Sequence, residues 1–561
     1  MSGFYEKHKE TLSKAREVIK TREEWAAFAE MPSEKHYGEG AKQKGEDEFN
    51  AMLGGKYEFK VPMEGAEYVQ CDATSPYGID MGMQYPKLDK DILLTRSEQA
   101  QKEWRKLDNE TRFGICMEIL DRLSKQSFLM VHSIMHTTGQ PYMMSFQAGS
   151  AHALERGLET IAYTADAMAA SATEAKWDKV TGKNKEGDLI SVKMDKTFKT
   201  RGKGVGVMIG CATFPTWNGY PGLFATLATG NSVIVKPSDK AILPLAITVD
   251  IMREVLQDAG VNPDVVQIAI SHNDRGYTQS IVQDKRIKMI DFTGGTAFGD
   301  WLRENTHGVQ LYLEQAGLNN ILIESTDNFR AMTSNIAFSL SLYSSQMCTA
   351  PQNIYIPIDG IETNDGHKTF DEVAAGIATA TEKLLGDDRR AFALMGALNS
   401  DDINKRVHES ANSDKAFVLN METVEYEAFP DALTAKPQLI KVSKDNPEIY
   451  EEQFGPMAYV IETDDAQDAL QLVCDSIEQH GAMTTALYSK DDSFKHQAMD
   501  DIADAGSPLS VNLTGGVYVN QSSAYSDFHG SGLNPAANVS LTDLGFVASR
   551  FGWVTIREQT N

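Results

Sequence analysis

Cysteine is scarce in this chain of 561 residues, and no two cysteines form a Cys-x-x-Cys pair. The five cysteines are widely spaced: Cys71, Cys116, Cys211, Cys348 and Cys474. A small odd number of dispersed cysteines does not build a disulfide framework, and no Cys/His cluster has the spacing of a zinc site. We therefore expect free thiols in a reducing cytoplasm and no metal site.

Long apolar runs are also missing. The most apolar stretch, residues 205–235, is broken by Pro215, Pro221 and several glycines, so it does not predict a membrane span. The first twenty residues carry charges throughout and lack the apolar segment of a signal peptide. The sequence therefore predicts a cytoplasmic protein with no membrane partner.

Positive charge is outweighed by negative charge. The chain has 53 Lys and Arg against 79 Asp and Glu, which gives a formal net charge of -26. Such a surface repels a phosphate backbone, so we expect no nucleic-acid partner. At roughly 100–200 residues per domain, the length predicts two to four domains with ample core.

Hydrophobic periodicity divides the chain into a helical first part and an alternating remainder. Residues 1–70 form a polar preface, with a helix expected at 13–28 and a loop at 38–45. Three helical stretches are predicted next, at 97–123, 126–137 and 146–171. Alternation of apolar and polar residues then predicts strands within 188–209.

Strand and helix patterns alternate beyond residue 209. Strands are predicted at 231–236, 265–270, 288–292, 320–324, 353–357 and 552–557. Helices are predicted at 243–259, around Cys348 and at 370–384. Such alternation is typical of a parallel sheet covered by helices on both faces, so the predicted fold class is α/β.

Cys348 and Glu314 are the two residues with the clearest chemical potential. Cys348 lies in SSQMCTAPQ before an apolar strand, and Glu314 lies in LYLEQAGLNN at the end of one. A thiolate is the best nucleophile available near neutral pH, and a buried carboxylate can act as a general base. Taken alone, a lone cysteine is more often an inert buried thiol and a lone glutamate a surface or capping group. The surrounding motifs decide between these readings.

Five short segments occur in a distinctive order. They are KPSD at 236–239, FTGG at 292–295, LEQAG at 313–317, QMC at 346–348 and EEQFGP at 451–456. Together they resemble the aldehyde dehydrogenase superfamily, over about residues 75–557. The resemblance implies a Rossmann-like cofactor domain, an α/β catalytic domain and a β oligomerisation arm, and hence a homodimer or homotetramer. The expected boundaries are 1–72 for an N-terminal helical extension, 73–187 and 202–312 for the cofactor domain, 313–505 for the catalytic domain, and 188–201 and 506–561 for the arm.

The resemblance also implies a role for each residue. Cys348 would attack an aldehyde to give a thiohemiacetal and then a thioester, which Glu314 would hydrolyse by activating water. The residues expected to bind NAD or NADP are Lys236, Ser238, Asp239, Gly294, Gly295, Glu452 and Phe454. Asp239 favours NAD and Lys236 favours NADP, so the choice stays open. Gly295 stands where the family has a serine, and the loop 271–276 lacks the family's glycine pattern.

The oxyanion hole departs from the family pattern. An asparagine is normally found about 23 residues before the lysine of the KP segment, and here that position is Thr213 (236 − 213 = 23). Asn218, five residues later, is the other candidate. The second donor would be the backbone N–H of Cys348.

Within the superfamily, the long preface and the ATFPTWN and LEQAGLNN segments resemble the phenylacetate-degradation PaaN-type proteins and their ring-cleavage semialdehyde relatives. This implies a small-molecule semialdehyde substrate, either free or attached to coenzyme A. Glu314 favours hydrolysis to the free acid. Two alternatives remain: a coenzyme-A-acylating aldehyde dehydrogenase, and a catalytically silent cofactor-binding scaffold, which the changes at Thr213, Gly295 and 271–276 motivate.

Overall fold

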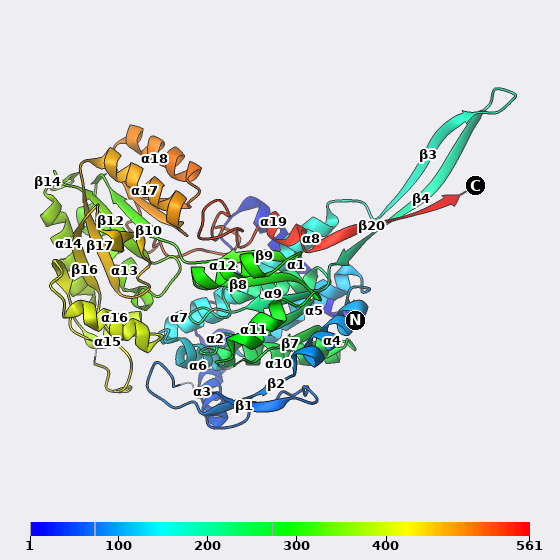
Figure 1. Ribbon diagram of the computed structural model, residues 1–561, viewed down its shortest axis with the longest axis horizontal. Coiled ribbons are helices and arrows are strands. Elements are labelled where there is room, and N and C mark those ends of the chain that lie inside the picture. The colour runs from blue at the N-terminus through cyan, green and yellow to red at the C-terminus, as the bar shows by residue number, and fades with distance from the viewer. Residues whose placement is uncertain (1, 72–73, 272, 424, 561) are drawn as a thin grey trace.

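The structure is a computed structural model and describes residues 2–71, 74–271, 273–423 and 425–560. Two α/β bodies lie side by side, and a narrow β-ribbon projects from the larger one (Figure 1). The predicted α/β class is confirmed. None of the helices in these ranges has the length and apolar character needed to cross a membrane.

The larger body is built on a five-stranded parallel sheet of order β7-β6-β5-β8-β9. Its strands are β5 Val205–Ile209, β6 Ser232–Lys236, β7 Val266–Ile268, β8 Ile287–Thr293 and β9 Gln310–Glu314. The helices that follow the strands are α9 Gly219–Ala228, α10 Ile242–Asp258, α11 Arg275–Val282 and α12 Thr296–Asn305. The strands are almost wholly buried, because helices cover both faces of a parallel sheet. Their carboxyl ends bring Lys236, Gly294 and Glu314 to one edge of the sheet.

The smaller body holds a seven-stranded sheet of order β15-β16-β17-β12-β10-β18-β19, parallel except for the β15–β16 pair. Its strands are β10 Asn319–Ile323, β12 Pro351–Pro357, β15 Phe417–Asn420, β16 Gln438–Ser443, β17 Met457–Thr463, β18 Thr485–Tyr488 and β19 Leu509–Val511. Its helices are α13 Phe329–Ser341, α14 Phe370–Leu385, α15 Asp388–Met395, α16 Asp401–Ala411, α17 Ala466–His480 and α18 Asp492–Asp504.

The helix predicted around Cys348 is wrong. Helix α13 ends at Ser341, and a short 3-10 turn, Leu342–Ser345, follows it. Tyr343, Ser344 and Ser345 all have positive φ angles, which an α-helix cannot accommodate. Cys348 therefore lies in a turn just before β12.

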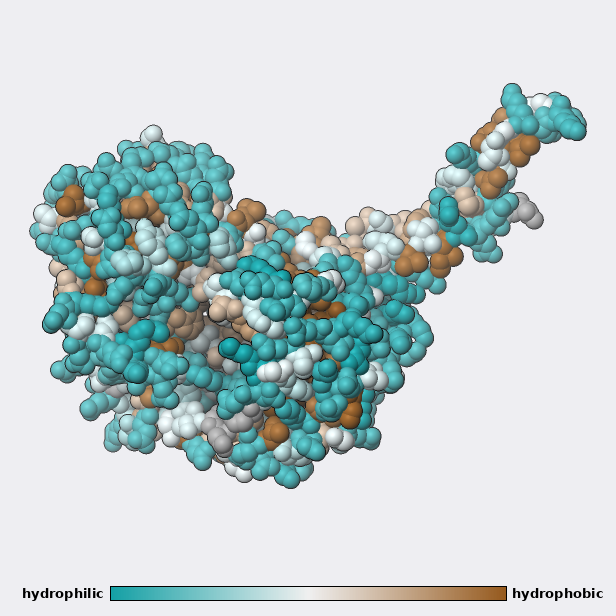
Figure 2. Space-filling model, in the orientation of Figure 1, coloured by the Kyte–Doolittle hydropathy of each residue, from teal (hydrophilic) through white to brown (hydrophobic). Residues whose placement is uncertain are grey.

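The ribbon is a three-stranded antiparallel sheet of order β20-β4-β3, with β3 Glu174–Lys183, β4 Leu189–Gly202 and β20 Phe551–Thr560. Apolar side chains lie along it in full view of solvent (Figure 2). They include Val180, Leu189, Ile190, Trp553, Val554 and Ile556. The boundary predicted at 187/188 therefore cuts the ribbon, since β3 belongs to it. The boundary at 505/506 is also displaced, because β19 pairs within the seven-stranded sheet.

The N-terminal extension contains α1 Ser2–Thr21, α2 Glu34–Tyr37 and α3 Ala41–Met52. The helix predicted at 13–28 therefore begins and ends earlier, and most of the loop predicted at 38–45 is helical, because α3 begins at Ala41. The boundary predicted at 72/73 falls outside the described residues. Helix α1 packs on α5 and α8, so the extension is part of the larger body.

The helical region predicted at 97–123 is two helices, α4 Lys90–Trp104 and α5 Asn109–Ser124, because Asp108 caps the second one. Next come α6 Ser127–Thr138, α7 Tyr142–Phe146, a π-helical turn Gln147–His152 and α8 Ala153–Ala169. The remaining short elements are β1 Glu67–Cys71, β2 Met83–Lys87, β11 Ser325–Thr326, β13 Ile361–Thr363, β14 Gly366–Lys368 and α19 Leu544–Ala548.

Candidate active site

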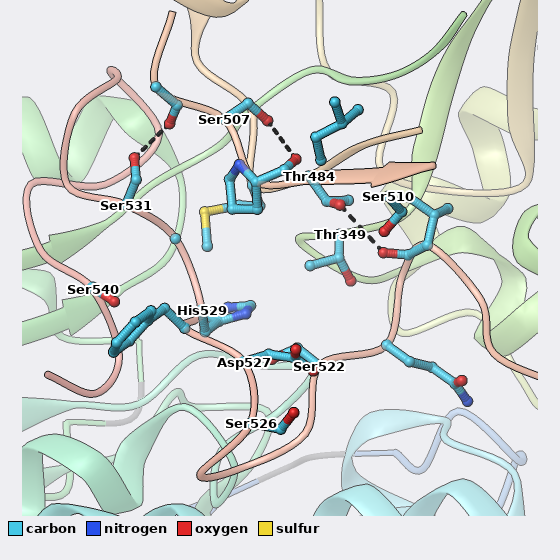
Figure 3. Close-up of a pocket in the computed structure, with 18 of the residues that line it drawn as sticks. Thr349, Thr484, Ser507, Ser510, Ser522, Ser526, Asp527, His529, Ser531 and Ser540 are labelled. Carbon is cyan, nitrogen blue, oxygen red and sulfur yellow. Dashed lines mark hydrogen bonds between the residues drawn. The ribbon is translucent and has the colours of Figure 1, made fainter. Parts of the chain in front are cut away.

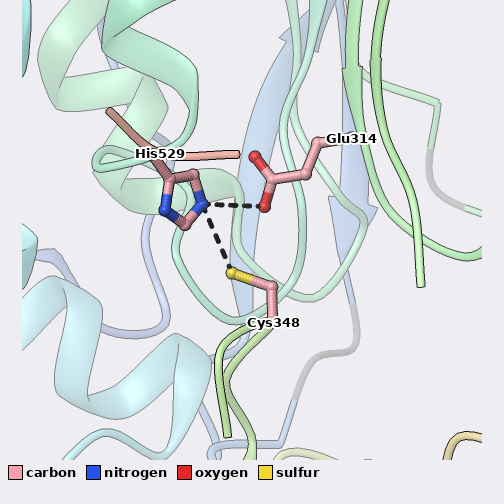
Figure 4. A group of neighbouring side chains, drawn as sticks. All are labelled: Glu314, Cys348 and His529. Atoms are coloured by element: carbon pink, nitrogen blue, oxygen red, sulfur yellow. Dashed lines mark hydrogen bonds and ion pairs between the residues drawn. The ribbon is translucent and has the colours of Figure 1, made fainter. Parts of the chain in front are cut away.

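Three side chains from distant parts of the chain meet between the two bodies (Figure 4). Glu314 ends β9, Cys348 occupies the turn before β12, and His529 lies on the loop that precedes α19. The Nε2 atom of His529 lies 3.6 Å from Cys348 Sγ and 3.2 Å from Glu314 Oε1. The two residues predicted for catalysis thus come together, and His529, which the sequence did not indicate, joins them.

The electrostatics of this cluster favour a carboxylate beside a thiol. Burial opposes ionisation of Glu314, but the charge and hydrogen bond of His529, together with hydrogen bonds from Cys348 and Asn218, hold its pKa below the usual value. Burial and the negative charge of Glu314 raise the pKa of Cys348 well above its ordinary range. Forming a thiolate here therefore requires a nearby group that can take the proton and balance the charge.

Asn218, at the start of α9, contacts the cluster directly. Its side-chain amide donates to Glu314 Oε2 at 3.0 Å and to Oε1 at 3.2 Å. The thiol of Cys211 donates to Asn218 Oδ1 at 3.8 Å, which fixes the orientation of the amide. Asn218 also lines the same cavity as Cys348.

Thr213 takes a different place. Its carbonyl oxygen accepts a hydrogen bond from Gln140 at 2.7 Å, and its hydroxyl interacts with Cys211. Thr213 is not among the described residues that line the cavity at Cys348. Of the two residues considered for the oxyanion hole, Asn218 is therefore the one that lies beside the nucleophile.

The loop that carries His529 is anchored on α8. The Arg156 guanidinium, wholly buried, donates to the carbonyl oxygens of Asp527 at 3.1 Å and Leu541 at 3.3 Å. The backbones of His529 and Leu541 exchange two hydrogen bonds, of 2.8 and 2.9 Å. The imidazole is therefore held by main-chain contacts on both sides of the loop.

A buried carboxylate joins this loop to the N-terminal extension. One oxygen of Glu155 accepts from the backbone N–H groups of Ala27 at 2.7 Å and Phe28 at 2.6 Å. The other accepts from the hydroxyl of Tyr525 at 2.6 Å. Burial raises the pKa of Glu155 to about 7, although these three donors lower it. The extension and the His529 loop thus share one side chain.

A cavity of about 460 Å³ leads to Cys348. Its apolar lining is contributed by Met143, Met144, Phe214, Trp217, Phe338, Leu342 and Met347. His152 and Glu30 also line it and form an exposed pair at 2.9 Å, while no Lys or Arg is found in the described part of the lining. Tyr220, by contrast, is a core residue, hydrogen-bonded to Thr248.

A second cavity, of about 590 Å³, shares His529 with the first (Figure 3). Hydroxyl groups are frequent in its lining: Ser507, Ser510, Ser522, Ser526, Ser531 and Ser540. The His529 loop therefore forms a wall between two cavities whose linings both mix polar and apolar side chains.

Lys236 and Asp239 lie at the carboxyl end of β6, as predicted. Lys236 Nζ is 3.4 Å from Asp239 Oδ1, and Asp239 also accepts from the Ser271 hydroxyl and the Asn273 N–H, both at 2.6 Å. Ser238 accepts weakly from the N–H of Lys240 at 3.4 Å. Asp239 thus fixes the 271–276 loop, of which residue 272 lies outside the described residues, and the ammonium group of Lys236 is held at the edge of the sheet.

The start of α12 fits an anion. Gly295 precedes the helix, no side chain caps it, and nothing lies within 4 Å of where a Cβ on Gly295 would be. The first N–H groups of a helix have no partner within the helix, so this open end can accept a diphosphate. At Gly294 a Cβ would come within 2.7 Å of the Phe292 ring, so glycine is needed there.

Glu452 and Phe454 line a narrow cleft that also includes Gly317 and Met347, next to Cys348 in sequence. Desolvation by the surrounding protein raises the pKa of Glu452 to about 7, and a hydrogen bond from the Gly317 N–H opposes that rise. The residue still has a solvent-exposed surface. A carboxyl group in this position can accept hydrogen bonds from ribose hydroxyls. Together with Lys236 and the open end of α12, these residues fit an extended dinucleotide.

Comparison with known proteins agrees with this geometry. A family model described as "Aldehyde dehydrogenase family" matches residues 77–536. The crystal structure of an NAD-dependent aldehyde dehydrogenase from Burkholderia multivorans is 46% identical, with a TM-score of 0.96 over 100% of this chain and 99% of that chain.

More distant curated relatives are also dehydrogenases. An N-succinylglutamate 5-semialdehyde dehydrogenase from Burkholderia cenocepacia is 24% identical over 69% of this chain and 74% of its own length. A lactaldehyde dehydrogenase from Methanococcus maripaludis is 22% identical over 72% and 81%, respectively.

Proposed function

This chain belongs to the aldehyde dehydrogenase family, and from that premise we propose that it oxidises an aldehyde to the free carboxylic acid with NAD or NADP. The observation that carries the proposal is that Cys348, Glu314 and Asn218 lie together at the 460 Å³ cavity. A nucleophile, a base and an amide donor are the groups that this reaction requires.

The chain's own residues perform the acyl chemistry. Cys348 Sγ forms a bond to the aldehyde carbon, and the carbonyl electrons move to oxygen. The amide of Asn218 and the backbone N–H of Cys348 stabilise that oxyanion. When bound, the nicotinamide cofactor supplies the hydride acceptor that turns the thiohemiacetal into a thioester. Glu314 then takes a proton from water as the water attacks the thioester, and the acid is released.

The oxyanion role thus passes from Thr213 to Asn218 in this proposal. The reason is position, because Asn218 lines the cavity with Cys348.

For the cofactor, Lys236 and Glu452 would hold the two riboses and Gly294-Gly295 would hold the diphosphate. Phe454 would pack near the nicotinamide. Asp239 is already engaged by Ser271 and Asn273, so its effect would be to place Lys236 and to put negative charge near the adenosine ribose. Negative charge there disfavours a 2′-phosphate, which supports NAD, as does the NAD dependence named for the B. multivorans enzyme.

The cavity lining bears on the substrate. In the described part of the lining, apolar side chains lie beside neutral polar ones such as Gln147, Asn520 and Ser522, and there is no Lys or Arg. A free carboxylate there would have hydrogen-bond donors but no Lys or Arg to pair with, and masking that carboxylate as a thioester or ester removes its charge. The substrate of this proposal is therefore a ring-cleavage semialdehyde of the phenylacetate type, free or attached to coenzyme A, with the attached form favoured.

The ribbon supports a homo-oligomer. Its edge strand β20 exposes Trp553, Val554 and Ile556, and the ribbon projects from the larger body (Figure 1), so this edge can pair with another chain. A homodimer or homotetramer would cover these side chains.

The test is NAD(P)H absorbance with a free semialdehyde, its methyl ester and its coenzyme A thioester, each with NAD and with NADP. Wild type should reduce the cofactor and Cys348→Ala should not. The masked substrates should have at least about tenfold higher kcat/KM than the free carboxylate. Equal rates on free and masked forms would refute the substrate class. An acyl-CoA product that appears only with added coenzyme A would favour the acylating alternative, and no reduction with any aldehyde would favour the silent scaffold.

A further inference from the structure

One ring nitrogen of His529 faces both groups proposed for catalysis. Nε2 lies 3.6 Å from Cys348 Sγ and 3.2 Å from Glu314 Oε1, and the imidazole is almost fully buried (Figure 4). From this geometry, and resting on the function proposed above, we propose that His529 is a third catalytic residue: it donates its Nε2–H to Glu314 and, as an imidazolium, stabilises the thiolate that forms when Cys348 gives its proton to Glu314.

Cys348 needs such a partner because of its surroundings. Its pKa is raised by burial and by the adjacent carboxylate, so the free thiolate is strongly disfavoured. Transfer of the thiol proton to Glu314 leaves a neutral acid, which no longer repels the new thiolate. The imidazolium of His529 then lies beside the thiolate, and its positive charge stabilises the anion.

The charged groups around His529 support an imidazolium. Glu314 faces it from β9, and its carboxylate is in direct contact. Cys211 and Glu452 are the other ionisable groups that act on Cys348. On its own loop, Asp527 accepts from the N–H of Ser523 at 2.8 Å. The field at the imidazole is therefore set mainly by one carboxylate.

The cation that packs against Trp217 is engaged elsewhere. Trp217 packs edge-on against the imidazole at 4.6 Å, and the guanidinium of Arg156 lies 5.1 Å from the Trp217 ring. Arg156 is paired with Glu159 at 2.8 Å and with backbone carbonyls. Its charge is thus balanced locally and does not oppose protonation of His529.

The proton balance closes around Glu314. As the S–C bond forms, the thiol proton moves to Glu314, which releases it to solvent, and the carbonyl electron pair moves to oxygen. The two-electron oxidation between the steps is the hydride loss already described. In hydrolysis, water gives a proton to Glu314, the C–S bond breaks, and the electron pair returns to Sγ. The imidazolium then holds the thiolate, and the proton taken by Glu314 returns to Sγ or leaves to solvent.

The experiment measures Cys348 without any substrate or cofactor. Iodoacetamide alkylates thiolates, and mass spectrometry of the peptide containing Cys348 gives its rate as a function of pH. In His529→Gln, an amide can still hydrogen-bond to Glu314 but carries no positive charge. We expect alkylation at neutral pH to fall by at least about tenfold and its midpoint to move to higher pH, because each pKa unit changes the thiolate fraction tenfold.

The matched control is His152→Gln, which removes a histidine that lines the same cavity but is paired with Glu30. Its alkylation profile should match that of wild type. His529→Asn is the second variant if His529→Gln does not fold, as judged by thermal melting. Identical profiles for wild type and the folded His529 variant would overturn the proposal and leave His529 as a positioning residue for Glu314. Since no aldehyde is used, the result is readable even if the proposed oxidation fails.

Discussion

Replacing Asn218 by alanine should impair the enzyme in two separable ways. The side-chain amide lies at the cavity beside Cys348 and donates to both oxygens of Glu314, at 3.0 and 3.2 Å. Removing an oxyanion donor typically lowers kcat by about 10²–10³, which corresponds to roughly 2.7–4 kcal/mol of transition-state stabilisation. We expect a loss of that size in Asn218→Ala at the pH optimum.

The second effect is on pH dependence. The pKa of Glu314 is held below its usual value, against burial, by His529, Cys348 and Asn218. A general base works only when ionised, so wild-type activity persists to low pH and is lost as the pH falls through that depressed pKa. Without the two amide hydrogen bonds the pKa of Glu314 rises. The acidic limb of the kcat profile should therefore move to higher pH.

Both effects are read from steady-state NAD(P)H absorbance across the pH range. Thr213→Val is the matched control, because Thr213 is the other residue considered for the oxyanion hole and its side chain interacts with Cys211 instead. It should stay close to wild type. The reverse result, with Thr213→Val losing about a hundredfold and Asn218→Ala unchanged, would refute the reasoning and return the oxyanion role to Thr213.

Three further changes have defined outcomes. Arg550→Met removes a buried guanidinium that donates to Asp291 at 2.7 Å. Because a buried carboxylate then loses its partner, the free energy of unfolding measured by urea titration should fall by about 3–5 kcal/mol. The double variant Arg550→Met/Asp291→Asn should recover part of that loss. Ile556→Lys places charge on the exposed ribbon and should reduce the assembly measured by light scattering, whereas an unchanged mass would argue against the ribbon as an interface. Arg156→Met removes two hydrogen bonds to carbonyl groups of the His529 loop, so amide hydrogen exchange across residues 522–541 should become faster and kcat should fall. Unchanged exchange would show that Arg156 does not hold this loop.

The parts of the fold that the sequence predicted are those where burial sets the residue pattern. Strand β6, for example, is buried along its whole length and reads as a continuous apolar run. Strand β3 was missed because nearly all of it is exposed, and its sequence EAKWDKVTGK is mixed. It is held by its register with β4 and not by a core, so no periodicity marks it.

The active-site residues also fall into some that the sequence predicted and some that it did not. Cys348 and Glu314 lie 34 residues apart (348 − 314) in segments with strong motifs, and the structure brings them together. His529 is 181 residues beyond Cys348, on an irregular loop. Nothing local distinguishes it from a surface histidine. Asn218 was considered only as a second choice, because a count of residues from Lys236 favoured Thr213 and cannot detect how the chain bends before α9.

The carboxyl group of Glu155 changes how the protein should be divided. Similarity to the family begins at residue 77, which invites a shortened protein that starts there. Yet Ala27 and Phe28 bind the same carboxyl group as Tyr525, which precedes His529, the residue whose imidazole contacts the nucleophile, by four residues (529 − 525). A protein that started at residue 77 would lack the two N–H donors of Ala27 and Phe28 to the Glu155 carboxyl group. The stretch that the family model matches and the stretch that supplies the donors to this carboxyl group are therefore different parts of the chain.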